Sequence, residues 1–269
     1  MECENRKKFI SKIIIFILMI SLLMPCIAQA QDETPIFNDN ITAGNYLYNE
    51  IKKQNANIIF FYDAKKMDET KIVKQILEEN TFKDDKGLGK LKDYYYQCVY
   101  KESKFSTKEL EEYDGMIYRF RYRPQYTITV KQDKIIQKKL KTIAKKLKRK
   151  TKYKTIKAIY NYVIKRIKHY CSGQNNIYRG YYTRKGNCVI YSSLFYMLCR
   201  NLNTPCRMVY NKKHCWNLVK LNKKWYFCDA CWDDNKKTQQ FFLRGKKDFK
   251  LHRNMIKVPQ KPIALRKFK

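Results

Sequence analysis

The 269-residue chain contains 58 Lys and Arg against 24 Asp and Glu, which gives a formal net charge of +34. This length accommodates two small domains, or one domain with a sizeable extension. Only one apolar run approaches the length of a membrane span, so a polytopic membrane protein is excluded. A charge of this sign attracts polyanions such as wall polymers, anionic lipids or nucleic acid. The alternative interpretation is that the lysines serve solubility alone.

The first 30 residues have the pattern of a secretory signal peptide. A basic stretch at residues 6–8 precedes an apolar run at 13–24, and the small residues Ala28 and Ala30 mark a cleavage site. An uncleaved membrane anchor is the alternative, but the run is shorter than the roughly 20 residues that a span needs. We therefore expect cleavage after Ala30 and a secreted or cell-surface protein.

Residues 31–132 contain no chemical motif and predict a small α+β domain. Its expected elements are a helix at 41–53, a strand at 57–62, a helix at 69–77, a loop at 84–87, a strand at 94–100, a helix after a capping box of Ser106 and Glu109, and a strand at 116–123. In the last strand aromatic residues alternate with arginines. We expect a half-buried strand with one solvated face; a surface that grips nucleic acid or glycan is the alternative.

Two amphipathic helices are expected at the start of a second domain, residues 133–256. The first lies within 131–154, where an apolar stripe runs through a lysine-rich segment. Its cationic side is either a solvated face or a surface-binding face. The second helix is expected at 151–169, with its isoleucines turned inward.

A third helix is expected to begin at Cys188. Asn187 is a suitable N-cap residue, and Ile190, Leu194 and Met197 recur at helical spacing. Cys188 thus falls in the first helical turn, where the helix dipole favours a thiolate. Such a cysteine is a candidate nucleophile if a base lies nearby.

The predicted base and its orienting acid lie on a hairpin that follows. Strands are expected at 214–221 and 224–231, joined by a tight turn at 222–223. If the strands pair directly across that turn, His214 lies one diagonal step from Asp229 on the same face. Asp229 is then placed to orient the imidazole of His214, which would take the proton of the thiol.

Three blocks of sequence around these residues resemble the transglutaminase-like superfamily in its bacterial secreted branch. The blocks are Gly-Asn-Cys188, His-Cys-Trp-Asn217 and Trp-Tyr-Phe-Cys-Asp-Ala-Cys-Trp-Asp-Asp234. The resemblance covers roughly residues 133–250. It implies an α+β fold with a papain-like core, in which helices pack on an antiparallel sheet, and a triad of Cys188, His214 and Asp229. Cys215 and Cys231 depart from the small residue and the Thr that are usual at these positions.

Several further site predictions accompany this triad. We expect Tyr182 and Trp216 to contact substrate, and the backbone amide of Cys188 to stabilise an oxyanion together with a donor from residues 178–184. No cofactor and no metal are expected, because Cys228 and Cys231 would point to opposite faces of a strand. Cys231 would lie opposite His214, which raises the hypothesis of a redox disulfide with Cys188.

The resulting functional hypothesis is a secreted thiol enzyme of acyl transfer. Its substrate is expected to be a protein or peptide, and we favour hydrolysis over cross-linking because bacterial members of the superfamily resemble hydrolases. The alternative is a catalytically inactive cationic module that binds cell-wall polymers or another anionic surface, including a membrane surface. No specific nucleic-acid partner is expected. A last short strand at 239–243 and a basic tail at 257–269 complete the predicted elements.

Overall fold

The computed structural model describes residues 34–63, 76, 94–109, 117–171, 175–249 and 263–268. Within these ranges, residues from Ile36 onward form one compact unit. The predicted signal peptide, the helix at 69–77 apart from Ile76, and the loop at 84–87 lie outside the described residues. In the described part of the chain, none of the helices has the length and apolar character needed to cross a bilayer.

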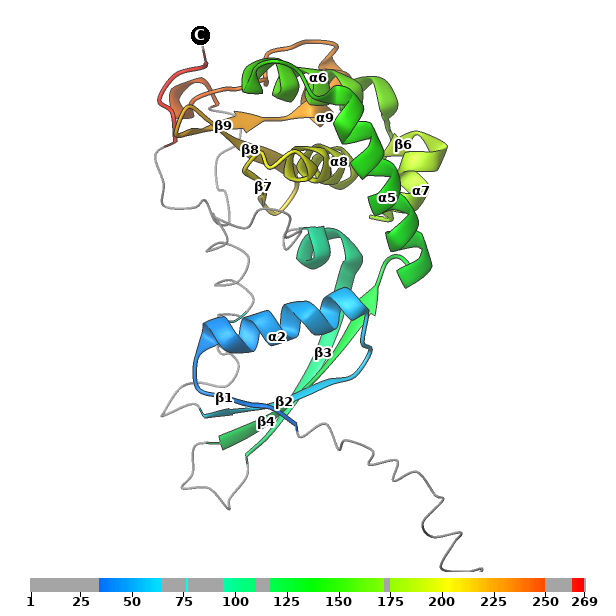
Figure 1. Ribbon diagram of the computed structural model, residues 1–269, viewed down its shortest axis with the longest axis vertical. Coiled ribbons are helices and arrows are strands. Elements are labelled where there is room, and N and C mark those ends of the chain that lie inside the picture. Colours follow the sequence, from blue (N-terminus) through cyan, green and yellow to red (C-terminus); the bar gives the residue numbers. More distant parts are fainter. Residues whose placement is uncertain are drawn as a thin grey trace, which may run out of the picture. The chain divides into compact units, whose positions relative to one another are not determined.

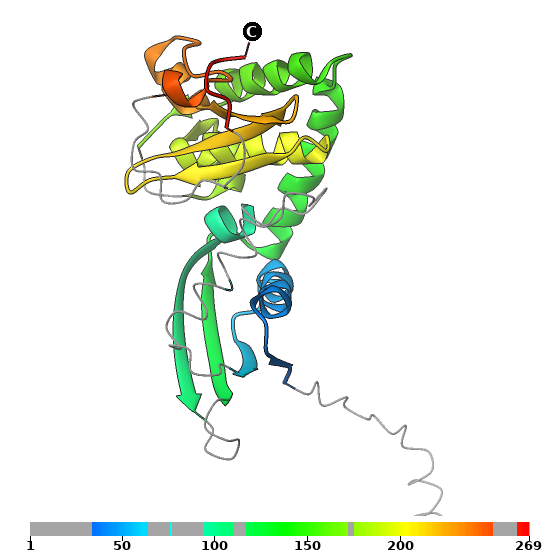
Figure 2. The same cartoon turned by 90° about the vertical axis from the view of Figure 1, so that its left-hand side faces the viewer.

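The first group of elements forms a four-stranded sheet in the order β1-β2-β4-β3, with helix α2 along one face (Figures 1 and 2). Its elements are β1 (Ile36–Phe37), α2 (Asn40–Lys53), β2 (Ile58–Asp63), the π-helical turn η1 (Tyr95–Val99), β3 (Tyr100–Glu109) and β4 (Ile117–Tyr126). Asp39 caps α2 by accepting the Ile41 and Thr42 amides at 2.9 and 2.8 Å. This satisfies two of the amides that a helix leaves unpaired at its start.

Strand β4 buries one of its two faces. Phe120 and Tyr122 are buried, and Phe120 stacks on Phe60 of β2 with ring centroids 5.1 Å apart, whereas Arg123 is exposed. The prediction of a half-buried strand is therefore confirmed. Two neighbouring predictions were wrong: η1 replaces most of the strand expected at 94–100, and the expected capping box lies within β3.

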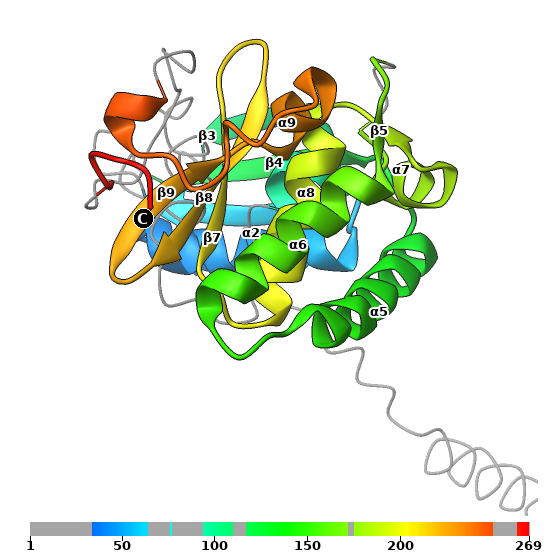
Figure 3. The ribbon, with the colours of Figure 1, turned by 90° about the horizontal axis from the view of Figure 1, so that it is seen from above.

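The second group of elements packs helices on the antiparallel sheet β7-β8-β9. Figure 3 shows α8 between α6 and this sheet. The elements are α5 (Val130–Leu147), α6 (Lys152–Arg166), β5 (Lys168–His169), α7 (Ile177–Thr183), β6 (Lys185–Gly186), α8 (Cys188–Asn201), β7 (Cys206–Tyr210), β8 (Cys215–Leu221), β9 (Lys224–Cys228), α9 (Ala230–Lys236) and the 3-10 turn η2 (Lys246–Asp248). The α+β fold predicted from the sequence is confirmed.

Helix α5 keeps its apolar stripe against the core despite its many lysines. Ile136, Leu140 and Ala144 are buried, whereas Ile135 is 37% exposed. A capping box begins the helix: Gln132 donates its amide to the Thr129 hydroxyl and accepts the Thr129 amide. Amphipathic packing thus overrides the repulsion among the exposed lysines.

The hairpin of β8 and β9 has the predicted register. Leu221 pairs with Lys224 and Asn217 with Cys228, and both turn residues, Asn222 and Lys223, have positive φ. Two positive φ angles are typical of the type I′ turn that fits the twist of paired strands. The strand predicted over 224–231 was too long, because β9 ends at Cys228.

The chain after β9 differs from the prediction in two ways. Asp229 caps helix α9, so the residues expected to extend the second strand are helical instead. The strand expected at 239–243 does not form, and a single bridge follows it, between Phe227 and Arg244. A carboxylate is a strong N-cap, and here the cap outweighs the aromatic alternation that favoured a longer strand.

The described end of the predicted basic tail, residues 263–268, lies along β9. Ile263 forms a parallel bridge with Trp225, and the Ala264 amide donates to the Trp225 carbonyl at 2.9 Å. A Cβ on Gly245 would lie 2.3 Å from the backbone nitrogen of Arg266, so this close crossing requires glycine. These residues therefore cover the outer edge of the sheet.

Candidate active site

Cys188 is the first residue of helix α8 and is held there by its neighbours. The Asn187 side-chain carbonyl caps the helix by accepting the Val189 and Ile190 amides at 3.1 and 3.4 Å. Gly186 packs so tightly on Ile190 that a Cβ would lie 2.6 Å from the Ile190 Cβ. The thiol is half-buried and not in a disulfide. It is thus a fixed and accessible sulfur at the positive end of a helix.

Two side-chain hydrogen bonds tie α8 to β8. The Ser192 hydroxyl donates to the Cys215 carbonyl at 2.9 Å, and the buried Asn217 amide donates to the Ser192 carbonyl at 3.1 Å. Asn217 also donates to the Arg207 carbonyl of β7 at 3.3 Å. The element that carries the thiol is therefore fixed against the strand that follows His214.

His214 lies at the end of a tight turn and between two indole rings. The Asn211 side-chain carbonyl accepts the His214 amide at 2.8 Å, which fixes the backbone. The imidazole stacks near Trp216 of β8 at 5.7 Å and near Trp232 of α9 at 5.3 Å between ring centroids. This packing restricts the ring to an orientation in which one nitrogen meets Asp229.

Asp229 uses its two carboxylate oxygens for different tasks. Oδ2 lies 2.6 Å from Nε2 of His214, and Oδ1 accepts the Trp232 amide at 3.0 Å as the cap of α9. The residue is 1% exposed, and the Tyr160 hydroxyl donates to its main-chain carbonyl at 2.8 Å. The helix cap thus holds the acid in place while it orients the imidazole.

The surroundings favour the charged form of His214. Burial lowers the pKa of the imidazole, but the hydrogen bonds and negative charges of Asp229 and Cys188 outweigh it and raise that pKa to about 9. Because Nε2 faces Asp229, Nδ1 is the nitrogen left for Cys188. In this arrangement the thiol can attack a carbonyl carbon. The imidazole, which the carboxylate orients, can transfer a proton to the leaving group.

The two residues predicted to contact substrate have different environments. Tyr182 is 47% exposed on α7 and packs on Tyr178 with ring centroids 4.7 Å apart. Trp216 has no exposed surface and lies in a small apolar core behind the His214 ring. Trp216 therefore supports the imidazole. Because it is fully buried, it has no surface with which to contact a substrate.

Trp232 is the residue of this site that sequence reasoning missed. Its half-buried ring packs beside His214 and also meets the ring of a core residue, Phe241, edge-on at 5.3 Å between centroids. The signal was the Asp229 carboxylate three residues earlier, a helix cap that would have placed Trp232 in the first turn of a helix. The prediction of a strand over 224–231 excluded this helix and therefore this position of Trp232.

Two further cysteines lie close to the thiol site but are buried. Burial is the main reason that the pKa of each of these thiols is raised. The charges of Asp229 and Cys188 add to this effect at Cys231, and the charge of Cys188 adds to it at Cys215. Both therefore remain thiols at neutral pH. Cys231 lies in α9 and not on the strand from which its place opposite His214 was predicted. Among the described residues, no group of three His, Cys, Asp or Glu side chains is arranged to hold a metal ion.

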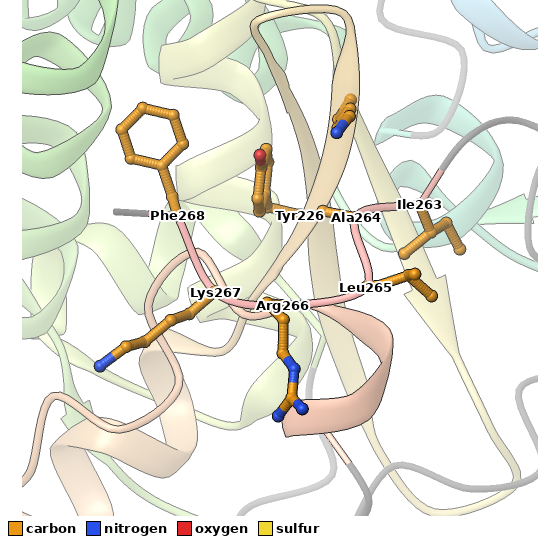
Figure 4. A pocket seen from close by; sticks show the side chains of 8 residues that line it. Tyr226, Ile263, Ala264, Leu265, Arg266, Lys267 and Phe268 are labelled. Atoms are coloured by element: carbon orange, nitrogen blue, oxygen red, sulfur yellow. The ribbon is translucent and has the colours of Figure 1, made fainter.

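A cavity of about 590 Å³ lies at the other end of β9 from Asp229 (Figure 4). Its lining combines cations with apolar and aromatic side chains from Lys224, Tyr226 and residues 263–268. Lys224 follows the hairpin turn, whereas Asp229 follows the last residue of the strand. The cavity is therefore separate from the cluster of Cys188, His214 and Asp229.

Comparison with known proteins supports the predicted family over the part of the chain that holds this cluster. Residues 141–230 match the model of the transglutaminase-like superfamily, and this range contains Cys188, His214 and Asp229. No curated protein matches the sequence.

Three solved structures resemble the chain weakly, each with a TM-score of 0.31. A candidate cysteine protease from Cytophaga hutchinsonii is 17% identical, with 49% of this chain and 65% of that chain covered. A TGase is 15% identical, with 73% and 58% covered. A candidate protease from Parabacteroides distasonis ATCC 8503 is 11% identical, with 46% and 36% covered. The chain thus spans less than two thirds of each of these proteins.

Proposed function

We propose that the chain, which carries a transglutaminase-like superfamily core over residues 141–230, is a cysteine peptidase or amidase that works through Cys188. The observation that carries this proposal is the 2.6 Å contact between His214 Nε2 and Asp229 Oδ2. This contact leaves the second ring nitrogen for a sulfur at the start of α8. A buried core cysteine would not require an imidazole and an acid aligned beside it.

In the proposed acylation step, the Cys188 sulfur attacks the carbonyl carbon of an amide. The carbonyl oxygen becomes an oxyanion that the Cys188 backbone amide is placed to stabilise, because the Asn187 cap takes the next two amides and not this one. The imidazolium of His214 donates its Nδ1 proton to the leaving amine as the C–N bond breaks. The enzyme then holds an acyl thioester, and His214 is neutral.

In the proposed deacylation step, His214 takes a proton from water and the resulting hydroxide attacks the thioester. The C–S bond breaks, the acid product leaves, and the proton on His214 restores the ion pair with the sulfur. A primary amine in place of water would give a new amide, which is cross-linking. We propose hydrolysis as the main outcome, and an extracellular setting that rests only on the signal-like sequence of residues 1–30.

An activated ester tests the thioester intermediate without knowledge of the natural substrate. With p-nitrophenyl acetate, we expect a burst of nitrophenolate and an acetyl group on the peptide that contains Cys188, detected by mass spectrometry. Cys188→Ser should lose both. Added methylamine then partitions the acetyl group between acetate and N-methylacetamide, which measures hydrolysis against transfer.

The second candidate function is an inactive cationic module, and the net charge of +34 favours it. Acetylation spread over surface lysines, with Cys188 unmodified, would support this module and contradict the enzyme. Binding to an anionic polymer that is lost with added salt and unchanged in Cys188→Ser would be its positive evidence.

A further inference from the structure

We infer that the surface around Cys188 selects peptides with an acidic side chain next to the amide that is cleaved. This inference rests on the proposed function and names its substrate class. Two cations from different elements, Lys236 of α9 and Lys185 of β6, carry it. Each is exposed, and each contacts an aromatic ring. The ring at Lys236 is Trp232, which packs beside His214, and the ring at Lys185 is Tyr170, whose backbone is bonded to the strand before Cys188.

Lys236 contacts the same aromatic ring, Trp232, that packs beside His214, the candidate base. Its Nζ is 4.9 Å from the centre of the Trp232 ring, and that ring lies 5.3 Å from His214. A cation–π contact fixes an ammonium group without neutralising it. A carboxylate that enters beside the Trp232 ring would therefore meet a positioned positive charge.

Lys185 lies on the short strand that leads into helix α8. It precedes Cys188 by three residues, on the short strand that pairs with β5. Its Nζ lies 5.7 Å from the centre of the Tyr170 ring, which is 54% exposed. The Tyr170 amide donates to the Gly186 carbonyl at 2.9 Å, so this aromatic and cationic pair is fixed to the strand that leads into the nucleophile.

No exposed acid balances these cations in the described segments that surround the site, residues 168–171, 175–189, 211–216 and 229–238. The acids in these segments are Asp229, Asp233 and Asp234, and all three are buried. Asp229 meets His214, Asp233 meets Tyr160, and Asp234 accepts from the Tyr191 hydroxyl at 2.5 Å. In the described part of the chain, no carboxylate pairs with Lys185 or Lys236.

The exposed charges in these described segments therefore have one sign, and they include Lys212 and Lys213, which directly precede His214. A single exposed ion pair changes a dissociation constant by about twofold to fivefold. Several cations around one site also raise the local concentration of anions. We expect a discrimination of about tenfold between acidic and neutral peptides at low salt.

A pair of alkylating reagents that differ in charge measures this preference directly. Iodoacetate is an anion and iodoacetamide is neutral, and both react with the same sulfur. We expect the ratio of their rates at Cys188, divided by the ratio for free cysteine, to exceed one at low salt and to fall toward one as salt is added. The ratio cancels changes in thiol reactivity and reports the charge around the sulfur. The His214 imidazolium contributes to that charge in the wild type and in every lysine variant, so the change of the ratio between these proteins reports the lysines.

Matched variants assign this effect to the named lysines. Lys236→Gln and Lys185→Gln should each lower the ratio about twofold to threefold, and the double variant further. Lys145→Gln, on the exposed side of α5, removes the same charge away from the site and should leave the ratio unchanged. An equal fall in all three single variants would show a general effect of net charge and overturn the inference.

Peptides extend the test to the proposed reaction. Three peptides that differ only in Glu, Gln or Lys beside the reacting amide should acylate Cys188 in the order Glu, Gln, Lys. If Cys188 reacts with both reagents and the three peptides react equally, the inference is wrong and the proposed function stands. If Cys188 reacts with neither reagent nor any peptide, the proposed function fails and the inference fails with it.

Discussion

Nε2 of His214 lies 2.6 Å from Oδ2 of Asp229, while the other oxygen of the same carboxylate caps helix α9. One side chain thus fixes the imidazole and the helix that carries Trp232. Replacing Asp229 by Asn should keep an oxygen for the helix cap and remove the charge opposite His214. This substitution separates the electrostatic task of the residue from its structural task.

The pH dependence of stability follows from the raised pKa of His214. Charged His214 is favoured in the folded protein, so its contribution is complete below the unfolded pKa of about 6.5 and is lost as the pH rises through about 9. The loss should be about 3 kcal/mol. Urea unfolding at pH 6 and pH 9.5 should show this difference in the wild type, and a smaller one in His214→Gln. Equal pH dependence in the two proteins would contradict the assigned pKa.

Gly186 is predicted to place the nucleophile as well as to pack. In Gly186→Ala the new methyl would meet the Cβ of Ile190 and push the strand away from α8, at a cost of about 1–3 kcal/mol. Alkylation of Cys188 should slow at least several-fold. Gly180→Ala is the matched control, because its methyl would meet the same Ile190 side chain from α7. A similar loss of stability with unchanged alkylation is expected there, and equal slowing in both would refute a positioning role for Gly186.

Asn217 is predicted to hold the two halves of the site together. Asn217→Ala removes the donor to two buried carbonyls, those of Ser192 and Arg207, and should cost about 1–3 kcal/mol. Asn201→Ala removes one bond within α8, to the Met197 carbonyl, and should cost less. Thermal unfolding compares the stability of the two variants. A larger loss of stability in Asn201→Ala than in Asn217→Ala would contradict the role assigned to Asn217.

The two tryptophans beside His214 should respond differently to truncation. Trp216→Ala empties a fully buried position and should cost about 3–5 kcal/mol. Trp232→Ala should cost less because the ring is only half-buried, but it should alter the rate of Cys188 acylation through the lost contact with His214. Chemical unfolding and the nitrophenolate burst measure the two effects. The opposite pattern would mean that Trp216 is the residue at the reacting surface.

Much of this arrangement could be predicted from the sequence because its signals are local. The Asn187 cap and the apolar spacing after Cys188 predicted α8, and the short turn at 222–223 fixed the hairpin register through Leu221 and Lys224. Pairing at one end of a hairpin determines which residues share a face farther along it. That rule predicted that His214 lies near Asp229.

The predictions failed at residues whose local sequence is compatible with two different secondary structures. Asp229 continues an aromatic, strand-like run and is also a helix cap, and only the packed structure selects the cap. No helix was predicted over residues 178–184, where α7 forms because Asn176 caps it and Gly180 packs on Ile190. Tertiary contacts decide such cases, and a single sequence does not contain them.

We expect Asp229 and His214 to activate the sulfur of Cys188, and the rate of iodoacetamide alkylation at Cys188 across pH 5 to 9 measures this activation. Peptide mass spectrometry assigns the modified residue, with Asp229→Asn and His214→Gln measured beside the wild type. Alkylation of Cys188 in the wild type should be rapid at about pH 6 and at least tenfold slower in each variant, because each variant weakens or removes the imidazolium partner of the thiolate. Alkylation that rises with pH like that of free cysteine, and is the same in all three proteins, would contradict this activation.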